Sequence, residues 1–481
     1  MSSAAAQQFL RDAAVKSADL GHREIIRRGM ESYDAAHLKG RSRIKDWEAA
    51  REKCQEIKRE AINHLDRYLL QFEEQVKARG GHVFWAENSE EACAYVKNLA
   101  VERKVKTIVK SKSMVTEEIH LGPVLEKAGI KVWETDFGEY IVQLRGEAPY
   151  HIVTPCMHLK RDQIADLFRE KLDKNIDSDD PAYLMGVARR ILRQAFFSAE
   201  MGISGANFIV ADAGVIAIST NEGNGRLCTS VPRIHVVVTG IEKVVPRLED
   251  LALFWPVLAT SGTGQGITTY STLIGGPRRA GESDGPEEFH VVLVDNGRSR
   301  LLADPEQREV LHCIRCGACL NICPVFRHVG GHTYGTTYPG PIGSVLTPHL
   351  AGVAEFNHLS YASSLCGACS SVCPVKIDLH HHLLQNRRNA TEAGATKSSE
   401  RMIFRLWRRV VMHPTIYAFG GWTVRRSLKA LYALGLAGSA LDPMRVWNRV
   451  RTPVPLPAKS FRAQWRDGLN SGNANGKNHA R

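Results

Sequence analysis

Apolar residues recur every three to four positions over residues 47–76, and this spacing predicts a long amphipathic helix with one buried face. Gly80 and Gly81 follow the last apolar position and predict the end of the helix, because glycine readily adopts the left-handed conformation of a helix C-terminus. Residues 1–43 are polar and show no clear period. We therefore expect an N-terminal helical segment over residues 1–80 that packs on the next domain.

Short apolar runs alternate with helical periods over residues 81–300, which predicts an α/β domain with a largely parallel sheet. The predicted strands are Thr107–Val109, Ile130–Trp133, Phe208–Ala211, Val215–Ile218, Ile234–Thr239 and Phe289–Val294. The predicted helices are Val115–Lys127, Leu159–Lys171, Ala182–Met201 and Val245–Leu258.

Charge is uneven along the 481 residues, whose net charge is +12. Residues 395–481 carry 16 Lys and Arg against three acidic residues, so the tail is strongly basic and the remainder is near neutral. Apolar residues interleave with these arginines, which favours peripheral contact with an anionic membrane face, or subunit docking, over nucleic-acid binding. The Gly/Asn-rich end, residues 470–481, is expected to be disordered.

The overall composition, 43% hydrophobic and 24% charged, is typical of a globular protein and excludes a wholly disordered chain. The sequence has no secretory-type apolar segment near its start and no stretch of 18 uncharged apolar residues. We therefore expect a cytoplasmic protein. Any contact with a membrane would be peripheral and would be made by the tail. The protein's 11 cysteines are then thiols or metal ligands rather than a disulfide framework.

The first cysteine run, residues 313–324, reads CIRCGACLNICP and has the C-x2-C-x2-C-x3-C-P spacing of bacterial ferredoxins. Closely spaced cysteines in a tight loop can present thiolates to several irons of one cubane cluster, and Gly317 relaxes the backbone between them. Structural zinc is the alternative, but zinc usually takes cysteine pairs separated by a longer spacer. Residues 303–392 are thus predicted to form a small helical two-cluster ferredoxin-type domain.

The second cysteine run, residues 366–374, repeats the last three cysteines of the motif, and Ser363 stands where the first would be. In two-cluster ferredoxins the last cysteine of each run ligates the other cluster. This rule assigns two [4Fe–4S] clusters, the first bound by Cys313, Cys316, Cys319 and Cys373, the second by Cys323, Cys366 and Cys369.

The second cluster therefore lacks a cysteine, and four explanations stay open. They are a three-cysteine [4Fe–4S] cluster with an open iron, which we favour, a [3Fe–4S] cluster, Ser363 as an oxygen ligand, or a distant ligand. His332 or His358 could be a ligand, but a hydrogen-bonding role in the loop is favoured for both. His380–His382 are interpreted as a solvated segment rather than a metal site, since three adjacent histidines cannot all face one side of a helix. Four other cysteines are expected to be buried thiols: Cys54, Cys93, Cys156 and Cys228.

Both cysteine runs, the loop between them (GGHTYG and YPGPIG, within residues 330–343) and several upstream segments together resemble the lactate utilization protein B family. The upstream segments are VKSKSM (109–114), ETDFGE (134–139), GISGAN (202–207), NEGNGR (221–226) and GIEKVVP (240–246). The resemblance covers most of residues 40–450, and the family likewise has three cysteines in its second run.

This resemblance implies a lactate-utilization domain similar to the sugar-phosphate isomerase and CoA-transferase group. It also implies an iron–sulfur electron-transfer subunit, a non-autonomous component that oxidises L-lactate to pyruvate jointly with two companion proteins. The alternatives are an electron relay for a different dehydrogenase and an iron–sulfur protein that binds nucleic acid. Neither the electron acceptor nor a catalytic residue is identified.

Seven polar residues are predicted at strand or helix ends of the α/β domain: Lys110, Lys112, Glu134, Asp136, Asn207, Asn221 and Glu222. Ligands of open α/β sheets bind outside the carboxyl ends of the strands, so these residues could form an anion pocket in which Lys110 and Lys112 face a carboxylate. Turn and capping roles are the alternative. The segment SGTGQG, residues 261–266, falls one residue short of a dinucleotide fingerprint and follows a helix, so nucleotide binding is not expected.

Overall fold

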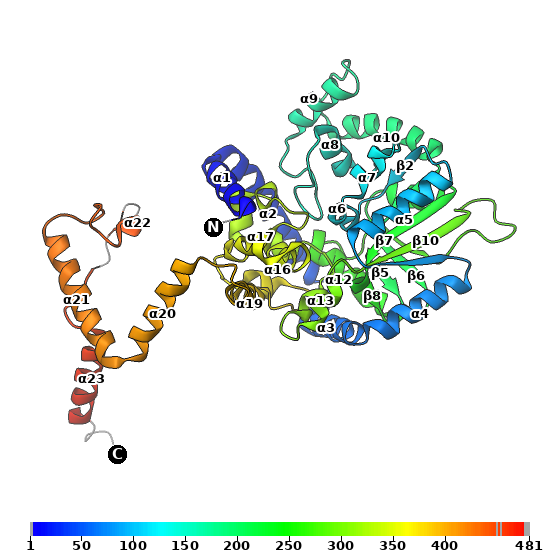
Figure 1. The fold of residues 1–481 in the computed structure, drawn as a ribbon. Coiled ribbons are helices and arrows are strands. Elements are labelled where there is room, and N and C mark those ends of the chain that lie inside the picture. The colour runs from blue at the N-terminus through cyan, green and yellow to red at the C-terminus, as the bar shows by residue number, and fades with distance from the viewer. Residues whose placement is uncertain (1–2, 449–450, 453–454, 476–481) are drawn as a thin grey trace. The chain divides into compact units, whose positions relative to one another are not determined.

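The computed structural model describes residues 3–448, 451–452 and 455–475. The chain divides into two compact units, Met1–Ala395 and Thr396–Arg481. The first unit contains the N-terminal helices, the α/β domain and the cysteine-rich region, and the second unit is helical (Figure 1).

Four helices precede the first strand: α1 (Ala4–Ala18), α2 (Leu20–Arg41), α3 (Trp47–Asn63) and α4 (Leu65–Ala78). The helix predicted over residues 47–76 is therefore two helices, because His64 leaves the helical conformation with φ −125° and ψ 41°. Residues 1–43, in which the sequence shows no clear period, are also largely helical, in α1 and α2. Helix α2 buries only Ile26, Met30 and Gly40, too few positions to leave a readable apolar stripe.

The large sheet has six parallel strands in the order β1-β10-β7-β4-β2-β3. Its strands are β1 (His82–Ala86), β2 (Thr107–Lys110), β3 (Lys131–Glu134), β4 (Met201–Ser204), β7 (Ile234–Gly240) and β10 (Glu288–Val294). The helices connecting or following them are α5 (Ser89–Glu102), α6 (Met114–Glu118), α7 (Leu121–Lys127), α8 (Phe137–Arg145), α9 (Arg161–Lys171), α10 (Pro181–Ser198) and α11 (Asn224–Ser230). Every residue of β7 is buried, as expected for a parallel strand covered on both faces.

A second, four-stranded sheet departs from the single parallel sheet that the alternation predicted. Its order is β8-β5-β6-β9, with strands β5 (Phe208–Val210), β6 (Val215–Thr220), β8 (Val244–Val245) and β9 (Tyr270–Ile274). Strands β5 and β6 pair antiparallel because only residues 211–214 connect them, far too few for the crossover that parallel pairing needs.

Two of the predicted helices differ from the observed ones, the first at its start and the second at its centre. The one predicted over Val245–Leu258 begins only at Leu251, in α12 (Leu251–Thr263), after the short helices η1 (Ile241–Lys243) and η2 (Leu248–Asp250). The one predicted over Val115–Lys127 is divided by His120, whose φ of 53° is left-handed.

The cysteine-rich region is helical, as predicted, and shares a hydrophobic core with the α/β domain. Phe72 of α4, Phe254 of α12 and Ile314 and Leu320 of the first cysteine run belong to the same buried cluster. Its elements are α13 (Arg298–Ala303), η3 (Arg308–His312), α14 (Ala318–Ile322), α15 (Pro324–Val329), η4 (His332–Tyr334), α16 (Gly340–Ala351), α17 (Val353–Phe356), η5 (Asn357–Tyr361), α18 (Ala368–Val372) and α19 (Leu379–Glu392). The shared core fixes both cysteine runs against the α/β domain.

The second unit contains α20 (Ser398–Met412), α21 (Pro414–Ala433), α22 (Arg445–Asn448) and α23 (Phe461–Asn475). Disorder was expected from residue 470, but α23 continues to Asn475, and residues 476–481 lie outside the described residues. Within the part of the chain that is described, no helix is long and apolar enough to cross a membrane.

Candidate metal centre and adjoining cavity

The two cysteine runs repeat one backbone conformation. In the first, Arg315 (φ 59°) and Gly317 (φ 79°) are left-handed and α14 follows. In the second, Leu365 (φ 54°) and Gly367 (φ 77°) are left-handed and α18 follows. Two left-handed residues curl the chain so that successive cysteines point to one side, and glycine adopts this conformation without strain.

The seven cysteines line two separate cavities in two groups. The first cavity is lined by Cys313, Cys316, Cys319 and Cys373. The second is lined by Cys323, Cys366 and Cys369. Each cavity thus receives the last cysteine of the other run, which is the grouping that the crosswise rule predicts. That these residues ligate iron stays a prediction.

The donor set fits iron–sulfur clusters, because soft thiolates select such clusters or zinc. Burial raises the pKa of the Cys373 thiol to about 12 and that of Cys369 to about 11, so metal loading must displace their protons. Backbone N–H groups already point at the sulfurs: Ile377 N lies 3.3 Å from Cys373 Sγ and Arg315 N lies 3.4 Å from Cys313 Sγ. Such hydrogen bonds tune the reduction potentials of clusters.

The second cavity differs from the first in its exposure and its missing cysteine. Cys366 is exposed, and the backbone N–H of Ala368 lowers its pKa. Ser363 lines this cavity, and its Oγ accepts a hydrogen bond from Leu365 N at 3.0 Å. The four other cysteines, all described, line neither cavity; Cys54, Cys93 and Cys228 are buried and Cys156 is half-buried.

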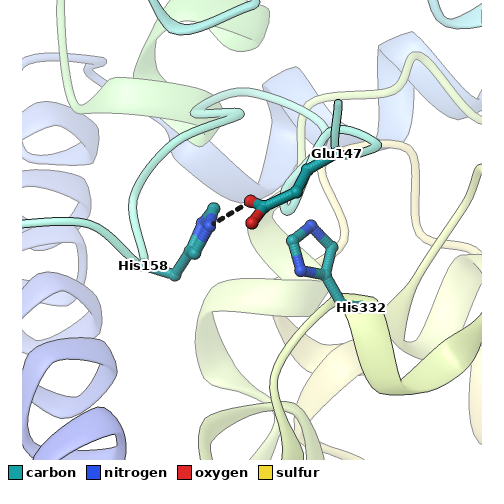
Figure 2. Close-up of side chains that lie close together, drawn as sticks. All are labelled: Glu147, His158 and His332. Carbon is teal, nitrogen blue, oxygen red and sulfur yellow. Dashed lines mark hydrogen bonds and ion pairs between the residues drawn. The ribbon is translucent and has the colours of Figure 1, made fainter. Parts of the chain in front are cut away.

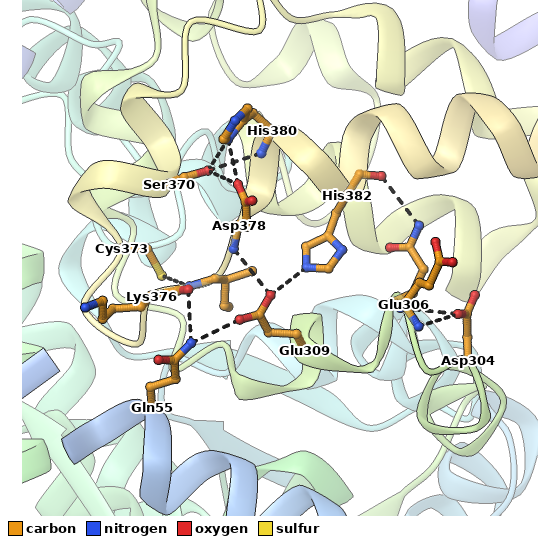
Figure 3. Close-up of polar contacts among 12 residues, drawn as sticks. Gln55, Asp304, Glu306, Glu309, Ser370, Cys373, Lys376, Asp378, His380 and His382 are labelled. Carbon is orange, nitrogen blue, oxygen red and sulfur yellow. Dashed lines mark hydrogen bonds and ion pairs between the residues drawn. The ribbon is translucent and has the colours of Figure 1, made fainter. Parts of the chain in front are cut away.

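The three consecutive histidines after the second run have different environments, shown in part in Figure 3. His381 is exposed, as expected. His382 was expected to be solvated, but it is buried and its Nε2 lies 3.0 Å from Glu309 Oε2. His380 lines the second cavity, and its Nδ1 lies 2.7 Å from Asp378 Oδ1. The helical geometry of α19 separates the three side chains, so they form no common site.

The polar cavity, about 380 Å³ in volume, lies beside the first cysteine cavity. Five of the seven predicted polar residues line it: Lys112, Asp136, Asn207, Asn221 and Glu222. Some of them also have the capping and turn roles that were the alternative. Asp136 caps α8 by accepting from Glu139 N, and Asn207 Oδ1 accepts from Ser219 N.

Lys110 and Glu134 do not line the polar cavity, which corrects the prediction that Lys110 faces a ligand. Lys110 is buried, and its Nζ lies 3.0 Å from both Glu117 and Glu134 and 3.8 Å from Glu139. Three carboxylates, of which Glu139 is fully buried and Glu117 is partly exposed, hold the ammonium group away from the cavity. The charge of Lys110 is thus used for structure.

Two cations that the sequence reading missed also line this cavity, Lys243 from η1 and Arg315 from the first cysteine run. Burial lowers the pKa of Lys243 to about 8, with Arg315 adding to the effect. Burial raises the pKa of Glu222 to about 7, and neighbouring Asp136 acts in the same direction. The cavity therefore combines lysines that suit an anion with a carboxyl group that can exchange a proton near neutral pH.

A buried charge network joins the α/β domain to the first cysteine run. Arg298 donates to Glu118 at 2.8 Å and to Glu242 at 2.5 Å, and Arg315 donates to Glu242 at 3.1 Å. Tyr338 OH donates to Glu118 at 2.7 Å, and the Arg315 guanidinium lies 4.7 Å from the Tyr338 ring centroid. This network fixes Arg315, which stands between two cysteines of the first cavity and also lines the polar cavity.

Comparisons with known proteins identify three regions of the chain. Residues 69–294 match the LUD domain, residues 309–377 the 4Fe-4S dicluster domain, and residues 380–468 the C-terminal domain of lactate utilisation protein B.

Lactate utilization protein B of Bacillus velezensis is 43% identical over 445 residues, covering 92% of this chain and 93% of the relative. That of Geobacillus thermodenitrificans is 44% identical over 430 residues, covering 89% and 90%. A crystal structure of a DUF162 family protein from Deinococcus radiodurans aligns at 14% identity with a TM-score of 0.27, over 48% of this chain and 98% of that chain, a likeness too low to carry an inference. The relatives and the matched domains show that this chain belongs to the lactate utilization protein B family, with an iron–sulfur role in lactate utilization.

Proposed function

We propose that this chain is the iron–sulfur electron-transfer subunit of a multi-protein system that oxidises L-lactate to pyruvate. The observation that carries the proposal is a shared wall: Arg315 and Cys316 line both the polar cavity and the first cysteine cavity. An anion in the polar cavity would therefore lie beside a predicted cluster ligand. Relatives named lactate utilization protein B support lactate as the substrate of the system.

The cysteine grouping supports two clusters in the crosswise arrangement. The first would be held by Cys313, Cys316, Cys319 and Cys373, and the second by Cys323, Cys366 and Cys369. Bound there, [4Fe–4S] clusters would accept and pass on single electrons. Oxidation of a 2-hydroxy acid releases two electrons, so two one-electron sites in one chain suit a stepwise relay.

The chain's own residues would orient the acid and take up a proton. Lys112 and Lys243 supply positive charge for a carboxylate, and Lys112 Nζ is positioned by a 2.6 Å hydrogen bond to the Val153 carbonyl. Glu222, with its pKa near 7, can accept a proton that the substrate releases. The two companion proteins would contribute the remaining chemistry and the path to the electron acceptor.

Iron and sulfide analysis with EPR tests this proposal, on anaerobically purified protein before and after dithionite. We expect about eight irons per chain and two interacting reduced signals. Lactate together with the companion proteins should then reduce the clusters, and Lys112→Met should lose most of that reduction while dithionite still reduces them. Full lactate-dependent reduction in Lys112→Met would remove the polar cavity from the mechanism, and about four irons would remove the two-cluster relay.

The basic tail supports a further part of the proposal, peripheral contact with an anionic membrane surface. Helix α20 exposes Ile403, Phe404, Leu406 and Trp407, each about 60% accessible, among the arginines of the same helix. Aromatic and aliphatic side chains interleaved with arginine suit a headgroup layer better than a duplex groove.

A further inference from the structure

Three side chains that could bind a divalent metal ion meet outside both cysteine cavities, between the α/β domain and the cysteine-rich region. They are Glu147, just after α8, His158, in the loop before α9, and His332, in η4 (Figure 2). One ligand atom from each lies within 4.8 Å of the other two. His158 Nε2 and Glu147 Oε2 are 3.0 Å apart, close to the roughly 3.3 Å between two ligands of a tetrahedral zinc ion with bonds of about 2.0–2.1 Å.

Hydrogen bonds outside the cluster leave one ligand atom of Glu147 and one of His332 available. Arg145 donates twice to Glu147 Oε1, at 2.8 and 2.7 Å, which leaves Oε2 for the cluster. His332 Nε2 lies 2.8 Å from the carbonyl oxygen of Ala148, so this nitrogen carries the ring proton and Nδ1 presents a lone pair. Metal-binding histidines commonly donate their other ring N–H to a carbonyl in this way.

Packing orients the rings before any metal binds. His158 stacks on Tyr150 with the ring centroids 4.6 Å apart, and His332 meets both rings edge-on at 4.9 and 5.0 Å. Tyr150 OH is itself held 2.9 Å from His22 Nε2. Because the rings are held, little conformational entropy remains to be lost on metal binding.

We propose that Glu147, His158 and His332 bind one divalent transition-metal ion of the zinc type. Two imidazoles and one carboxylate suit such borderline ions, whereas the clusters take thiolates. Three protein ligands leave a coordination position open, and Glu147 and His332 line a cavity that can supply water or a small ligand to it. The ion would tie the α/β domain to the loop between the cysteine runs.

Zinc analysis of the cluster-loaded full-length protein tests the site, after treatment with a mild chelator and dialysis against ZnCl2. We expect one zinc per chain, with nitrogen and oxygen neighbours at about 2.0–2.1 Å in zinc K-edge EXAFS and no sulfur shell at about 2.3 Å. His332→Ala and Glu147→Gln should each weaken zinc binding more than about 100-fold with iron content unchanged. His381→Ala, which removes an exposed histidine, should bind zinc like the wild type.

Three results would overturn the proposal: no bound zinc, zinc with sulfur neighbours only, or unchanged zinc binding in both variants. Glu147→Gln keeps the side-chain shape, so it decides the matter if His332→Ala fails to fold. Because iron is measured in the same samples, failure of the zinc site is distinguishable from failure of the clusters.

A second, independent observation concerns the cysteine missing from the second cavity, and it rests on the proposed function. His380 lines that cavity together with Cys323, Cys366 and Cys369. Its Nδ1 lies 2.7 Å from Asp378 Oδ1 and 2.8 Å from Ser370 Oγ. Both contacts are drawn in Figure 3. A carboxylate that accepts from Nδ1–H fixes the tautomer, so Nε2 carries the lone pair that can bind a metal.

We infer that His380 Nε2 is the fourth protein ligand of the second cluster, in place of the open iron favoured from sequence. Replacing a cysteine by a histidine raises the reduction potential of a cluster, since a neutral ligand replaces an anionic one. His380→Ala removes a protein ligand from one iron, so it should convert the second cluster to a [3Fe–4S] signal, without changing the first.

Pulsed EPR of protein labelled with ¹⁵N-histidine reads the bond directly. A strong nitrogen coupling on one reduced cluster, lost in His380→Ala and kept in His381→Ala, is the expected result. Two intact clusters without any histidine coupling would overturn the inference while leaving the electron relay intact. Absence of the second cluster from the wild type would instead overturn the proposed function.

Discussion

The two cysteine runs share a backbone conformation but lie in opposite surroundings. The first has four buried or half-buried cysteines, a charge network through Arg298 and Arg315, and the polar cavity on one wall. The second has three cysteines, one of them exposed, and its cavity is lined by Ser363 and His380. A duplicated motif can thus keep one geometry while its environment sets one copy beside the polar cavity and the other near solvent. We expect electrons to enter at the first and leave at the second.

The largest expected effect tests the crosswise division itself. Cys373 belongs by sequence to the second run but lines the first cavity. Cys373→Ala should therefore abolish the first cluster and leave about half the iron. Iron analysis and EPR measure this, and Cys156→Ala, outside both cavities, serves as the control. Loss of the second cluster's signal with the first retained would show that each run binds its own cluster.

Because of the charge network, loss of an arginine beside the first run should lower the free energy of unfolding more than loss of an arginine near the second run. Arg298→Met leaves Glu118 and Glu242 buried without their main partner and should lower the free energy of unfolding by about 3–5 kcal/mol. Arg388→Met near the second run breaks an exposed pair with Glu306 and should cost about 0–1 kcal/mol. Anaerobic urea denaturation compares the two, and similar losses would contradict the distinction.

Ser363→Cys should make the second run more like the first. A fourth thiolate in the second cavity, taking the position proposed for the neutral His380, should lower the potential of the second cluster and slow its loss in air. Redox titration followed by EPR measures the potential, and the first cluster serves as the internal control. An unchanged second signal would place residue 363 out of reach of the cluster.

Glu222 should give the polar cavity a pH dependence that the second run lacks. Because its pKa in the folded protein is raised to about 7, protonated Glu222 favours folding, and this stability is lost as the pH rises through about 7. The Tm of the wild type should therefore fall from pH 5 to pH 8 more than that of Glu222→Gln. Glu306→Gln, which changes an exposed residue outside the polar cavity, should follow the wild type. Parallel Tm profiles for the wild type and Glu222→Gln would contradict the shift.

The smallest effect concerns the basic tail that follows the second run. Arg405→Gln should weaken binding to anionic vesicles about fivefold, since one basic side chain near such a surface contributes about 1 kcal/mol. Co-sedimentation at low salt measures this, with neutral vesicles as the control. Equal pelleting of the wild type with both kinds of vesicle would exclude charge-driven docking.

Local signals in the sequence were sufficient for the cysteine runs. The spacing of the cysteines and the position of Gly317 can be read within a few consecutive residues. The structure groups the cysteines as the crosswise rule predicts. Five of the predicted polar residues do line one cavity. Lys112, Asp136 and Asn207 follow the adjacent parallel strands β2, β3 and β4, whose carboxyl ends share one edge of the large sheet. Asn221 and Glu222 instead follow β6 of the second sheet, which pairs antiparallel, so that rule does not account for them.

Contacts between distant segments were not readable. Lys110 and Lys112 look alike in sequence, and only the positions of Glu117, Glu134 and Glu139 decide that Lys110 is buried. Arg315 was overlooked because its partner Glu242 is 73 residues away. The second sheet was missed since β8 has two residues and β9 is only half-buried, so neither leaves a pattern.

The exchange of cysteines between the runs has a consequence for how the protein is made. During synthesis the chain emerges from its N-terminus, and the first cavity stays incomplete until Cys373 has left the ribosome. By then Cys323, Cys366 and Cys369 have emerged as well, so both sets of thiols become complete almost together. With the proposed crosswise ligation, we expect iron delivery to follow translation of the whole region, and a chain truncated between the runs to complete neither site.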